Sequence, residues 1–337
     1  MGLDLTLTAL QADRLPFALE LLPASAYFVG GSVRDALLRR DRADFDLDIV
    51  LPSEAISVAR SLADRYQGGF VVLDEQRQIA RVVLDGGTID IAQQVGPTVE
   101  TDLKRRDFRI NAIAYNPHHQ KLIDPLKGVE DLKTGVLRMV AKDNLADDPL
   151  RVLRAYRQAA QLDFVIKPKT RNALRKFAPR LKRVSGERVR QELNLLLANP
   201  QGLTQLKAAV DDQVLSDWLP QLKKPTLAQI EQVEQVAWLL GRIWLDLDMT
   251  LNHTLSSKSL SLLSLAKLAC CVASQPERAA AQLSQLKYSR AEIQAVKTVL
   301  TAMPDLLQLL QNRRKLRMNL LIIHGCPTFV STPQQLR

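Results

Sequence analysis

Three aspartates stand at alternate positions in the chain, Asp44, Asp46 and Asp48. Side chains alternate between the two faces of a β-strand, so this spacing predicts three carboxylates on one face and a core on the other. Like charges repel one another, and a divalent cation with oxygen ligands would relieve that repulsion. Two such carboxylates can hold the Mg²⁺ ions used in in-line phosphoryl transfer. The pattern is equally typical of the solvated face of an edge strand, and the aspartates alone leave both interpretations open.

A glycine turn lies shortly before the aspartates. A predicted strand over 26–29 ends at Gly30 and Gly31, and a helix is expected from Ser32 to Leu38. Glycines permit a tight turn and close approach of a phosphate, and a helix N-terminus attracts an anion. Arg34 adds a planar guanidinium within one helical turn. With the aspartates, the turn predicts a site for a triphosphate and a metal, although neither a P-loop nor a dinucleotide-binding motif is present.

The segment from Phe28 to Val50 resembles the first signature of the class II tRNA nucleotidyltransferase and bacterial poly(A) polymerase family. That signature reads G-G-x-V-R-D-x-L-L-G, followed by D-x-D, and here Arg39 replaces the last Gly. The resemblance implies nucleotide binding by Gly30, Gly31 and Arg34. Ungapped spacing from the glycines places the family's two-Mg²⁺ site on Asp44 and Asp46 as the catalytic pair. Asp48 then remains an additional acid without an assigned role.

A second motif spans Lys104–Tyr115, whose apolar residues recur at helical spacing and predict an amphipathic helix. It is similar to the family's R-R-D-F-T-x-N-A-x-A motif, with Arg109 in place of Thr. The resemblance implies that Arg106 contacts a nucleotide phosphate and that Asp107 and Asn111 lie near the sugar. A polar partner for the 2′-hydroxyl would favour ribonucleotides.

A third motif places Asp148, Arg151, Arg154 and Arg157 at steps of three along a predicted helix. Alone, this stripe is typical of a salt-bridged helix surface. It resembles the family's E-D-P-x-R-x-L-R-x-x-R motif, with Asp147 in place of Glu. The resemblance implies that all four residues bind the nucleotide. Asp148 and Arg151 would hydrogen-bond the edge of the incoming C or A, so that the protein replaces a template.

A basic segment follows this motif. Residues 167–190 contain ten Lys or Arg and a single acid. Such a run is commonly a solvated face, but phosphate contacts of this kind also position RNA without reading its sequence. Because the segment lies one helix beyond the nucleotide motifs, we expect contacts with tRNA. The residues predicted to make them are Lys169, Arg175, Lys176, Lys182 and Arg183.

Composition agrees with a nucleic-acid partner. The 337 residues carry 46 Lys and Arg against 36 Asp and Glu, a net charge of +10, which favours a polyanion. Three cysteines are too few for a disulfide framework and predict a reducing, cytoplasmic location. No run of 18 apolar residues is present, so no membrane partner is expected.

The chain changes texture near residue 145. Short strand patterns mixed with helices precede this point, and Leu, Ala and Gln at helical spacing follow it. We therefore predict an α+β protein. An N-terminal nucleotidyltransferase head with a mixed sheet (1–145) should precede an all-helical neck that recognises the base (146–200). A helical body and tail that binds tRNA should complete it (201–337).

The resemblance implies a Mg²⁺-dependent enzyme that adds nucleotides to the tRNA 3′ end without a template and releases pyrophosphate. Only residues 93–101 separate the strand Thr88–Ala92 from residues 102–104, which lead into the second motif. Relatives that add A usually carry a flexible loop here. The shortened connection predicts the CC-adding subtype, which uses CTP and leaves the final A to a separate enzyme that uses ATP. A full CCA-adding enzyme, an A-adding enzyme and a poly(A) polymerase are the alternatives. A non-catalytic RNA-binding protein is disfavoured because the motif residues are intact.

Overall fold

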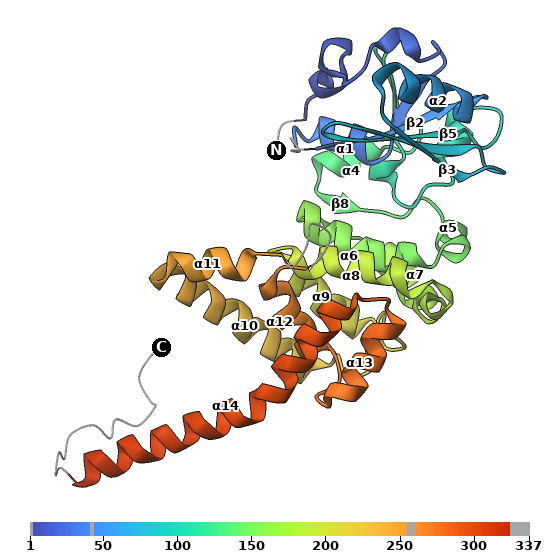
Figure 1. The fold of residues 1–337 in the computed structure, drawn as a ribbon. Coiled ribbons are helices and arrows are strands. Elements are labelled where there is room, and N and C mark those ends of the chain that lie inside the picture. The colour runs from blue at the N-terminus through green and yellow to red at the C-terminus, as the bar shows by residue number, and fades with distance from the viewer. Residues whose placement is uncertain (1–2, 41–43, 255–259, 324–337) are drawn as a thin grey trace. The chain divides into compact units, whose positions relative to one another are not determined.

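The structure is a computed structural model that describes residues 3–40, 44–254 and 260–323 (Figure 1). It divides into two compact units, Met1–Pro220 and Gln221–Arg337, which are described separately. The first unit contains all three nucleotide motifs and the basic segment. The division into head, neck and body at residues 145 and 200 stays a prediction.

The first unit is built on a seven-stranded mixed sheet with the order β3-β4-β5-β2-β1-β6-β7. Neighbouring strands are antiparallel except β2 and β5, which pair in parallel. This confirms the predicted α+β head. The strands are β1 (Tyr27–Val29), β2 (Phe45–Leu51), β3 (Gly69–Asp74), β4 (Ile79–Leu84), β5 (Gly87–Gln93), β6 (Ala114–Asn116) and β7 (Lys121–Ile123).

Helices cover the two faces of the sheet differently. Helix α2 (Ala55–Tyr66) buries Ala59 and Leu62 and contacts β3, β4 and β5. On the other face, Val50 of β2 belongs to a core cluster with Leu103 of α3 (Val99–Leu103). Helix α1 (Gly31–Leu37) follows β1, and α4 (Gly128–Lys133) follows β7. Helix α3 therefore covers one end of the sheet face that carries Val50, and the rest of that face is open.

The remainder of the first unit is helical. A short two-stranded sheet pairs β8 (Val136–Leu137) with β9 (Val165–Ile166), and the first two helices of this region lie between these strands in the sequence. Helix α6 contacts α8 and α9, and Tyr156 of α6 is fully buried. The helices are α5 (Lys142–Asp147), α6 (Leu150–Leu162), α7 (Pro168–Phe177), α8 (Gly186–Ala198) and α9 (Gly202–Asp211).

The helix predicted over Lys104–Tyr115 is wrong. Helix α3 ends at Leu103, a single 3-10 turn spans Arg109–Asn111, and β6 begins at Ala114. The apolar residues are buried as predicted, but backbone pairing decides the structure, because β6 completes the sheet beside β1. Helical spacing alone could not distinguish these outcomes.

The second unit is helical throughout its described part, apart from one isolated bridge between Thr254 and Ser261. Its helices are α10 (Lys224–Ile243), α11 (Leu245–Asn252), α12 (Leu262–Cys271), α13 (Pro276–Gln285) and α14 (Arg290–Ile323). Over residues 3–40, 44–254 and 260–323, no helix combines the length and the apolar character needed to cross a membrane.

Candidate active site

The open face of the sheet presents its carboxylates as a compact group. Asp46 and Asp48 project from β2 on one face, and Asp90 of β5 is the register partner of Asp48. We call the side chains of Asp46, Asp48 and Asp90 the acidic row. The hydroxyl of Thr88 donates to Asp46 Oδ1 at 3.0 Å and fixes the orientation of that carboxylate.

Asp44 lies outside this group. Strand β2 begins at Phe45, and Asp44 is an exposed residue in the bend before it. The three aspartates therefore do not share one strand face as the spacing predicted. Asp46 and Asp48 are the pair that the sheet holds on one face, and Asp48 is the acid to which the sequence assigned no role.

The glycine turn closes directly on Asp48. Gly30 has φ +73° and precedes α1, and a Cβ built on it would lie 2.9 Å from Asp48 Oδ2 and 3.1 Å from Arg106 Nη1. Only a glycine leaves this space open. Burial raises the pKa of Asp48, the guanidinium of Arg106 opposes that rise, and the nearby charge of Asp46 adds to it. A carboxylate and a guanidinium thus meet at a small cradle beside the backbone of α1.

An ion pair borders the acidic row. Arg81 of β4 donates from Nε and Nη2 to the two oxygens of Asp90, both at 2.7 Å. The hydrogen bond to Asp90 raises the pKa of Arg81. Asp90 is therefore held by an arginine, whereas the side-chain carboxylate of Asp48 accepts no hydrogen bond from the described residues.

Arg34, expected to reach a phosphate, lies inside a buried network. Its Nε donates to Asp35 and its Nη1 donates to Asn111 Oδ1, each at 2.8 Å, and only 3% of the residue is exposed. Its Nη2 lies 3.6 Å from the position of a Cβ on Gly31. Arg34 thus supports the glycine turn from beneath and ties α1 to the second motif.

The same network contains Asp107 and Asn111, which were expected near the sugar. The amide of Asn111 donates to Asp107 Oδ1 at 2.8 Å and to Gln158 Oε1 of α6 at 3.0 Å. Arg154 pairs with Asp107 Oδ2 at 3.0 Å. Burial alone would raise the pKa of Asp107, but Arg154, the amide of Asn111 and the N–H of Phe108 together hold it below its usual value.

The stripe of the third motif also makes contacts within the chain. Arg188 donates to Asp148 at 2.8 Å, and Arg157 of α6 donates to Glu192 of α8 at 2.7 Å. Arg151 Nη1 donates to the backbone carbonyls of Arg105 (2.8 Å) and Asn144 (3.0 Å). Asp148 precedes α6 and keeps 30% of its side chain exposed, so its carboxylate faces solvent as well as Arg188.

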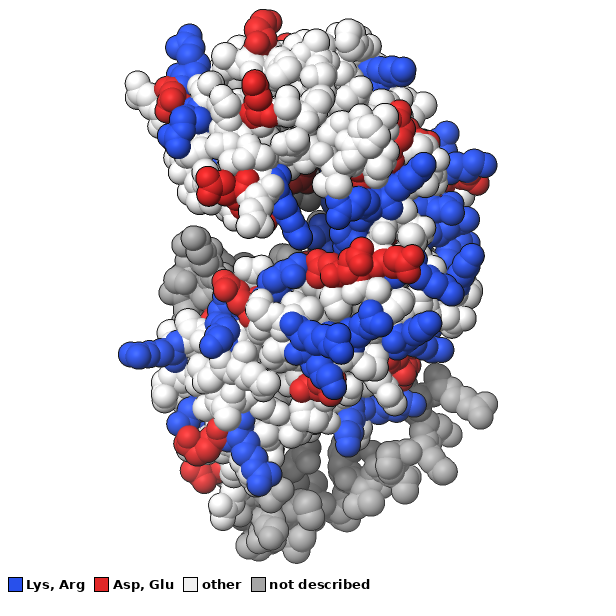
Figure 2. All heavy atoms as spheres, turned by 90° about the vertical axis from the view of Figure 1, so that its right-hand side faces the viewer, with Lys and Arg blue, Asp and Glu red and all other residues white. Residues whose placement is uncertain are grey.

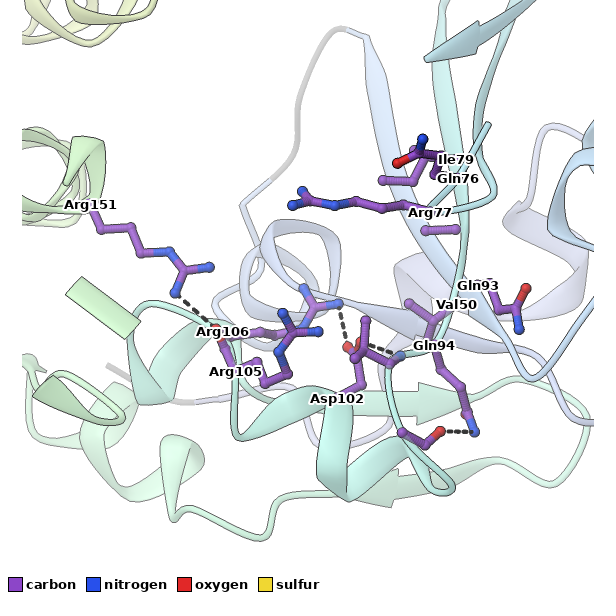
Figure 3. A pocket seen from close by; sticks show the side chains of 13 residues that line it. Val50, Gln76, Arg77, Ile79, Gln93, Gln94, Asp102, Arg105, Arg106 and Arg151 are labelled. Carbon is purple, nitrogen blue, oxygen red and sulfur yellow. Dashed lines mark hydrogen bonds and ion pairs between the residues drawn. The ribbon is translucent and has the colours of Figure 1, made fainter. Parts of the chain in front are cut away.

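A cavity of about 630 Å³ lies between the edge of the sheet and the start of α6 (Figure 3). We call it the arginine cavity, because four arginines line it: Arg77, Arg105, Arg106 and Arg151. Figure 3 shows Arg151 approaching from α6 and Arg77 extending from the β3–β4 turn on the other side. Two predicted nucleotide-binding residues, Arg106 and Arg151, therefore line one cavity.

The basic residues expected to contact tRNA are exposed but do not form a single site. Figure 2 shows Lys and Arg gathered on the face that carries α7. Lys169 lines a cavity of about 830 Å³ that also includes Arg109 and Arg138. Arg175 and Lys182 line another of about 360 Å³, where Arg175 also pairs with the buried Asp212. Lys176 and Arg183 are exposed.

Sequence reasoning missed several residues that the structure brings to the site. Gln158 lies 47 residues along the chain from Asn111, and no local pattern marks it. Arg81 lies nine residues from Asp90, its partner across the β4–β5 hairpin, so the register of that hairpin could have indicated it. Thr88 alternates with Asp90 on a predicted strand, a spacing that could have placed both beside the β2 aspartates. Arg77 has no motif signal, and Arg105, the first arginine of the second motif, was given no role, since only the fold brings these two segments together.

The residues present suit a divalent cation shared with a ligand. Among the described residues, no group of three or more His, Cys, Asp or Glu side chains is arranged to hold a metal by itself. The acidic row nevertheless offers two carboxylates on one strand face beside the open cradle at Gly30. Oxygen ligands of this type are those that Mg²⁺ prefers, with phosphate oxygens completing its coordination.

Comparisons with known proteins agree with this geometry. Residues 26–138 match the family described as "Poly A polymerase head domain", and residues 163–224 match "Probable RNA and SrmB- binding site of polymerase A". The chain is 48% identical over 295 residues to a CC-adding tRNA nucleotidyltransferase of Synechocystis sp., covering 87% of this chain and 70% of that protein. It is 46% identical over 177 residues to a CC-adding tRNA nucleotidyltransferase of Geobacter sulfurreducens, covering 52% and 41%.

A solved structure shares the fold. The Thermotoga maritima CCA-adding enzyme complexed with tRNA superposes with a TM-score of 0.67 and 29% identity, covering 86% of this chain and 68% of that chain. The family match at the head, the relative with 48% identity and the arrangement of glycine turn and acidic row lead to one conclusion. The chain belongs to the family of tRNA nucleotidyltransferases and poly(A) polymerases.

Proposed function

We propose that this protein transfers cytidylyl groups from CTP to the 3′ end of tRNA. The observation that carries the proposal is the placement of Asp46 and Asp48 on one strand face, with Asp48 directly against the turn at Gly30. This arrangement brings two metal-ligand carboxylates to an anion-binding helix start, as nucleotidyl transfer requires. The similarity to CC-adding enzymes supports the choice of substrate.

We assign the metal pair to Asp46 and Asp48 rather than to Asp44 and Asp46. Ungapped spacing from the glycines assumed a fixed loop length before the strand, but β2 begins only at Phe45. Asp48, not Asp44, lies at the glycine cradle. Bound Mg²⁺ would activate the attacking hydroxyl and neutralise charge on the triphosphate.

The chain's own residues then orient the two substrates. The turn at Gly30 and Gly31 and the side chain of Arg106 receive the triphosphate, and Arg34 keeps the turn in place. The RNA 3′ oxygen bonds to the α-phosphorus as the bond from that phosphorus to the β-bridging oxygen breaks. Pyrophosphate and one proton are released. Asp148 and Arg151 are proposed to hydrogen-bond the base of CTP.

The short connection after β5 supports addition of C without the terminal A. Only residues 94–98 separate β5 from α3, and the first two of them are held by hydrogen bonds from their backbone N–H groups. Gln94 N–H donates to the carbonyl of Leu51 at 2.8 Å, and Val95 N–H donates to Asp102 at 3.1 Å. We infer that no segment is left here to reshape the base pocket for ATP, so a separate enzyme would add the A. The cytoplasmic location expected from composition stays a prediction.

The test offers the purified protein tRNAs that end at the discriminator base, after one C or after two C. Each is incubated with Mg²⁺ and CTP, ATP or both, and products are resolved at single-nucleotide length. We expect the protein to add two C to tRNA that ends at the discriminator base, one C to tRNA that ends after one C, and nothing to tRNA that ends after two C. Efficient ATP use on tRNA ending in CC would favour a full CCA-adding or A-adding enzyme. Long A tails would favour a poly(A) polymerase, and no addition at all would reject the proposal.

A further inference from the structure

The arginine cavity continues the surface of the acidic row. Its floor includes Val50, Ala92 and Ile79, which pair across β2, β5 and β4. In each strand the floor residue lies two positions from a residue at the acidic row, namely Asp48, Asp90 and Arg81. Because such side chains share a face of the sheet, a ligand in the cavity lies beside the proposed reaction centre.

The cavity carries an excess of positive charge. Its single acid is Asp102, which pairs with Arg106 at 3.2 Å and also accepts the N–H of Val95. Among the described residues, the guanidinium of Arg77 forms an ion pair only with Asp74, at 3.7 Å on an exposed turn. The side chain of Arg105 forms no ion pair with the described residues. A cavity with this charge and an apolar floor suits a ligand with phosphates and a flat apolar part.

Strand order separates the Arg77 end of the cavity from the triphosphate cradle, which the Arg106 end of the cavity adjoins. Gly30 follows β1 on one side of β2, whereas β5, β4 and the Arg77 turn lie on the other side. In an in-line phosphoryl transfer, the entering and leaving oxygens lie on opposite sides of the phosphorus. With pyrophosphate leaving on the β1 side, the attacking hydroxyl arrives from the β5 side, where the cavity opens.

We propose that the Arg77 end of the arginine cavity binds the phosphodiester backbone at the 3′ end of the acceptor RNA. This inference rests on the proposed function, because it assigns a place to one of the two substrates of that reaction. Arg77 and Arg105 contact phosphates from two walls, and the apolar floor receives a sugar or a base. Such contacts position the strand so that its terminal hydroxyl reaches the acidic row, without reading sequence.

The experiment measures binding of tRNA lacking CCA, in the absence of CTP, at several salt concentrations. The variants are Arg77→Ala and Arg105→Ala, with Arg65→Ala as the matched control, since Arg65 is an exposed arginine of α2 outside the cavity. We expect each cavity variant to raise the Kd about 5- to 30-fold through loss of a charged contact. Each should also reduce the slope of log K against log salt by about one. Arg65→Ala should change neither.

A second measurement locates the contact on the RNA. A tRNA whose 3′-terminal phosphodiester is replaced by an uncharged methylphosphonate should bind the wild type more weakly but bind Arg77→Ala no more weakly than ordinary tRNA does. Additive losses would place Arg77 elsewhere on the RNA and overturn the assignment. A raised KM for CTP with unchanged tRNA binding would also overturn it, by showing that the cavity takes the nucleotide. Failure of wild-type CTP addition would reject the proposed function instead.

Discussion

Two aspartate sites in the first unit show how the same side chain serves different ends. Asp212, which follows α9, has a fully buried side chain that accepts from the hydroxyl of Tyr156 and from the guanidinium groups of Arg171 and Arg175. At the acidic row, the carboxylate of Asp48 has no hydrogen-bond donor among the described residues and lies beside another carboxylate. A carboxylate that accepts hydrogen bonds from several side chains, such as Asp212, serves the fold. A carboxylate without donors, such as Asp48, is arranged to bind an external cation.

The consequence for electrostatics is opposite at the two sites. Burial alone would raise the pKa of Asp212, but its donors hold that pKa below the ordinary value. At Asp48 burial prevails and the pKa is raised. The first carboxylate lowers the energy of the folded chain in its ionised form. The second has no hydrogen-bond donor, and the nearby charges of Arg106 and Arg154 offset its burial only in part.

The largest expected effect tests the acidic row itself. Asp46→Asn and Asp48→Asn should each lower kcat about a thousandfold, because removing a metal ligand costs several kcal/mol of transition-state stabilisation. Asp44→Asn should cost far less, since Asp44 is exposed in the bend before β2. Single-turnover CTP incorporation measures all three, with circular dichroism as the check on folding. A severe loss of rate in Asp44→Asn, combined with a near-normal rate in Asp48→Asn, would instead support Asp44 and Asp46 as the metal pair.

The next effect concerns the site at Asp212. Asp212→Ala should lower the free energy of unfolding by about 2–4 kcal/mol, since it leaves the buried Tyr156 hydroxyl unpaired and removes the partner of two arginines. Both arginines are partly exposed, so solvent limits the loss. Asp211→Ala is the matched control, because Asp211 is the exposed neighbour. Urea unfolding followed by circular dichroism gives the difference, and equal losses in both variants would contradict the assigned role.

The stability that Asp212 provides should depend on pH. Its pKa is lower in the folded chain than in the unfolded chain, so its contribution is complete above the unfolded value, about 3.9, and is lost as the pH falls through the folded value. The difference in unfolding free energy between wild type and Asp212→Asn should stay constant from pH 7 to pH 5 and shrink below about pH 4. Urea unfolding of both proteins at matched pH values measures it. A difference that grew on acidification would show that the donors do not favour the ionised form.

The sequence predicted the kind of chemistry at the site better than it predicted where each side chain lies. Alternating aspartates, the glycine turn and the shortened connection after β5 are local patterns, and the residues they indicated lie in one unit. Our proposal moves the metal pair two residues along the chain, from Asp44 and Asp46 to Asp46 and Asp48, because the loop length before a strand has no local signature. Arg34 and Asp107 are buried against Asn111, and Asn111 in turn donates to Gln158, a partner that only the packing of α6 brings within reach.

The smallest expected effect refines the comparison, because it concerns the hydrogen bond from Thr88 on β5 to Asp46 on β2. Thr88→Val keeps the shape of the side chain but removes the hydroxyl that donates to Asp46. Losing an outer hydrogen bond to a metal ligand should lower kcat about tenfold, and Thr88→Ser should restore most of the rate. Thr134→Val on the exposed end of α4 is the control. The apparent Mg²⁺ requirement should rise in Thr88→Val alone, a change that a purely structural role would not produce. If the Mg²⁺ dependence stayed unchanged while stability fell, the hydroxyl of Thr88 would stabilise the fold, as the donors to Asp212 do, and would have no part in metal binding.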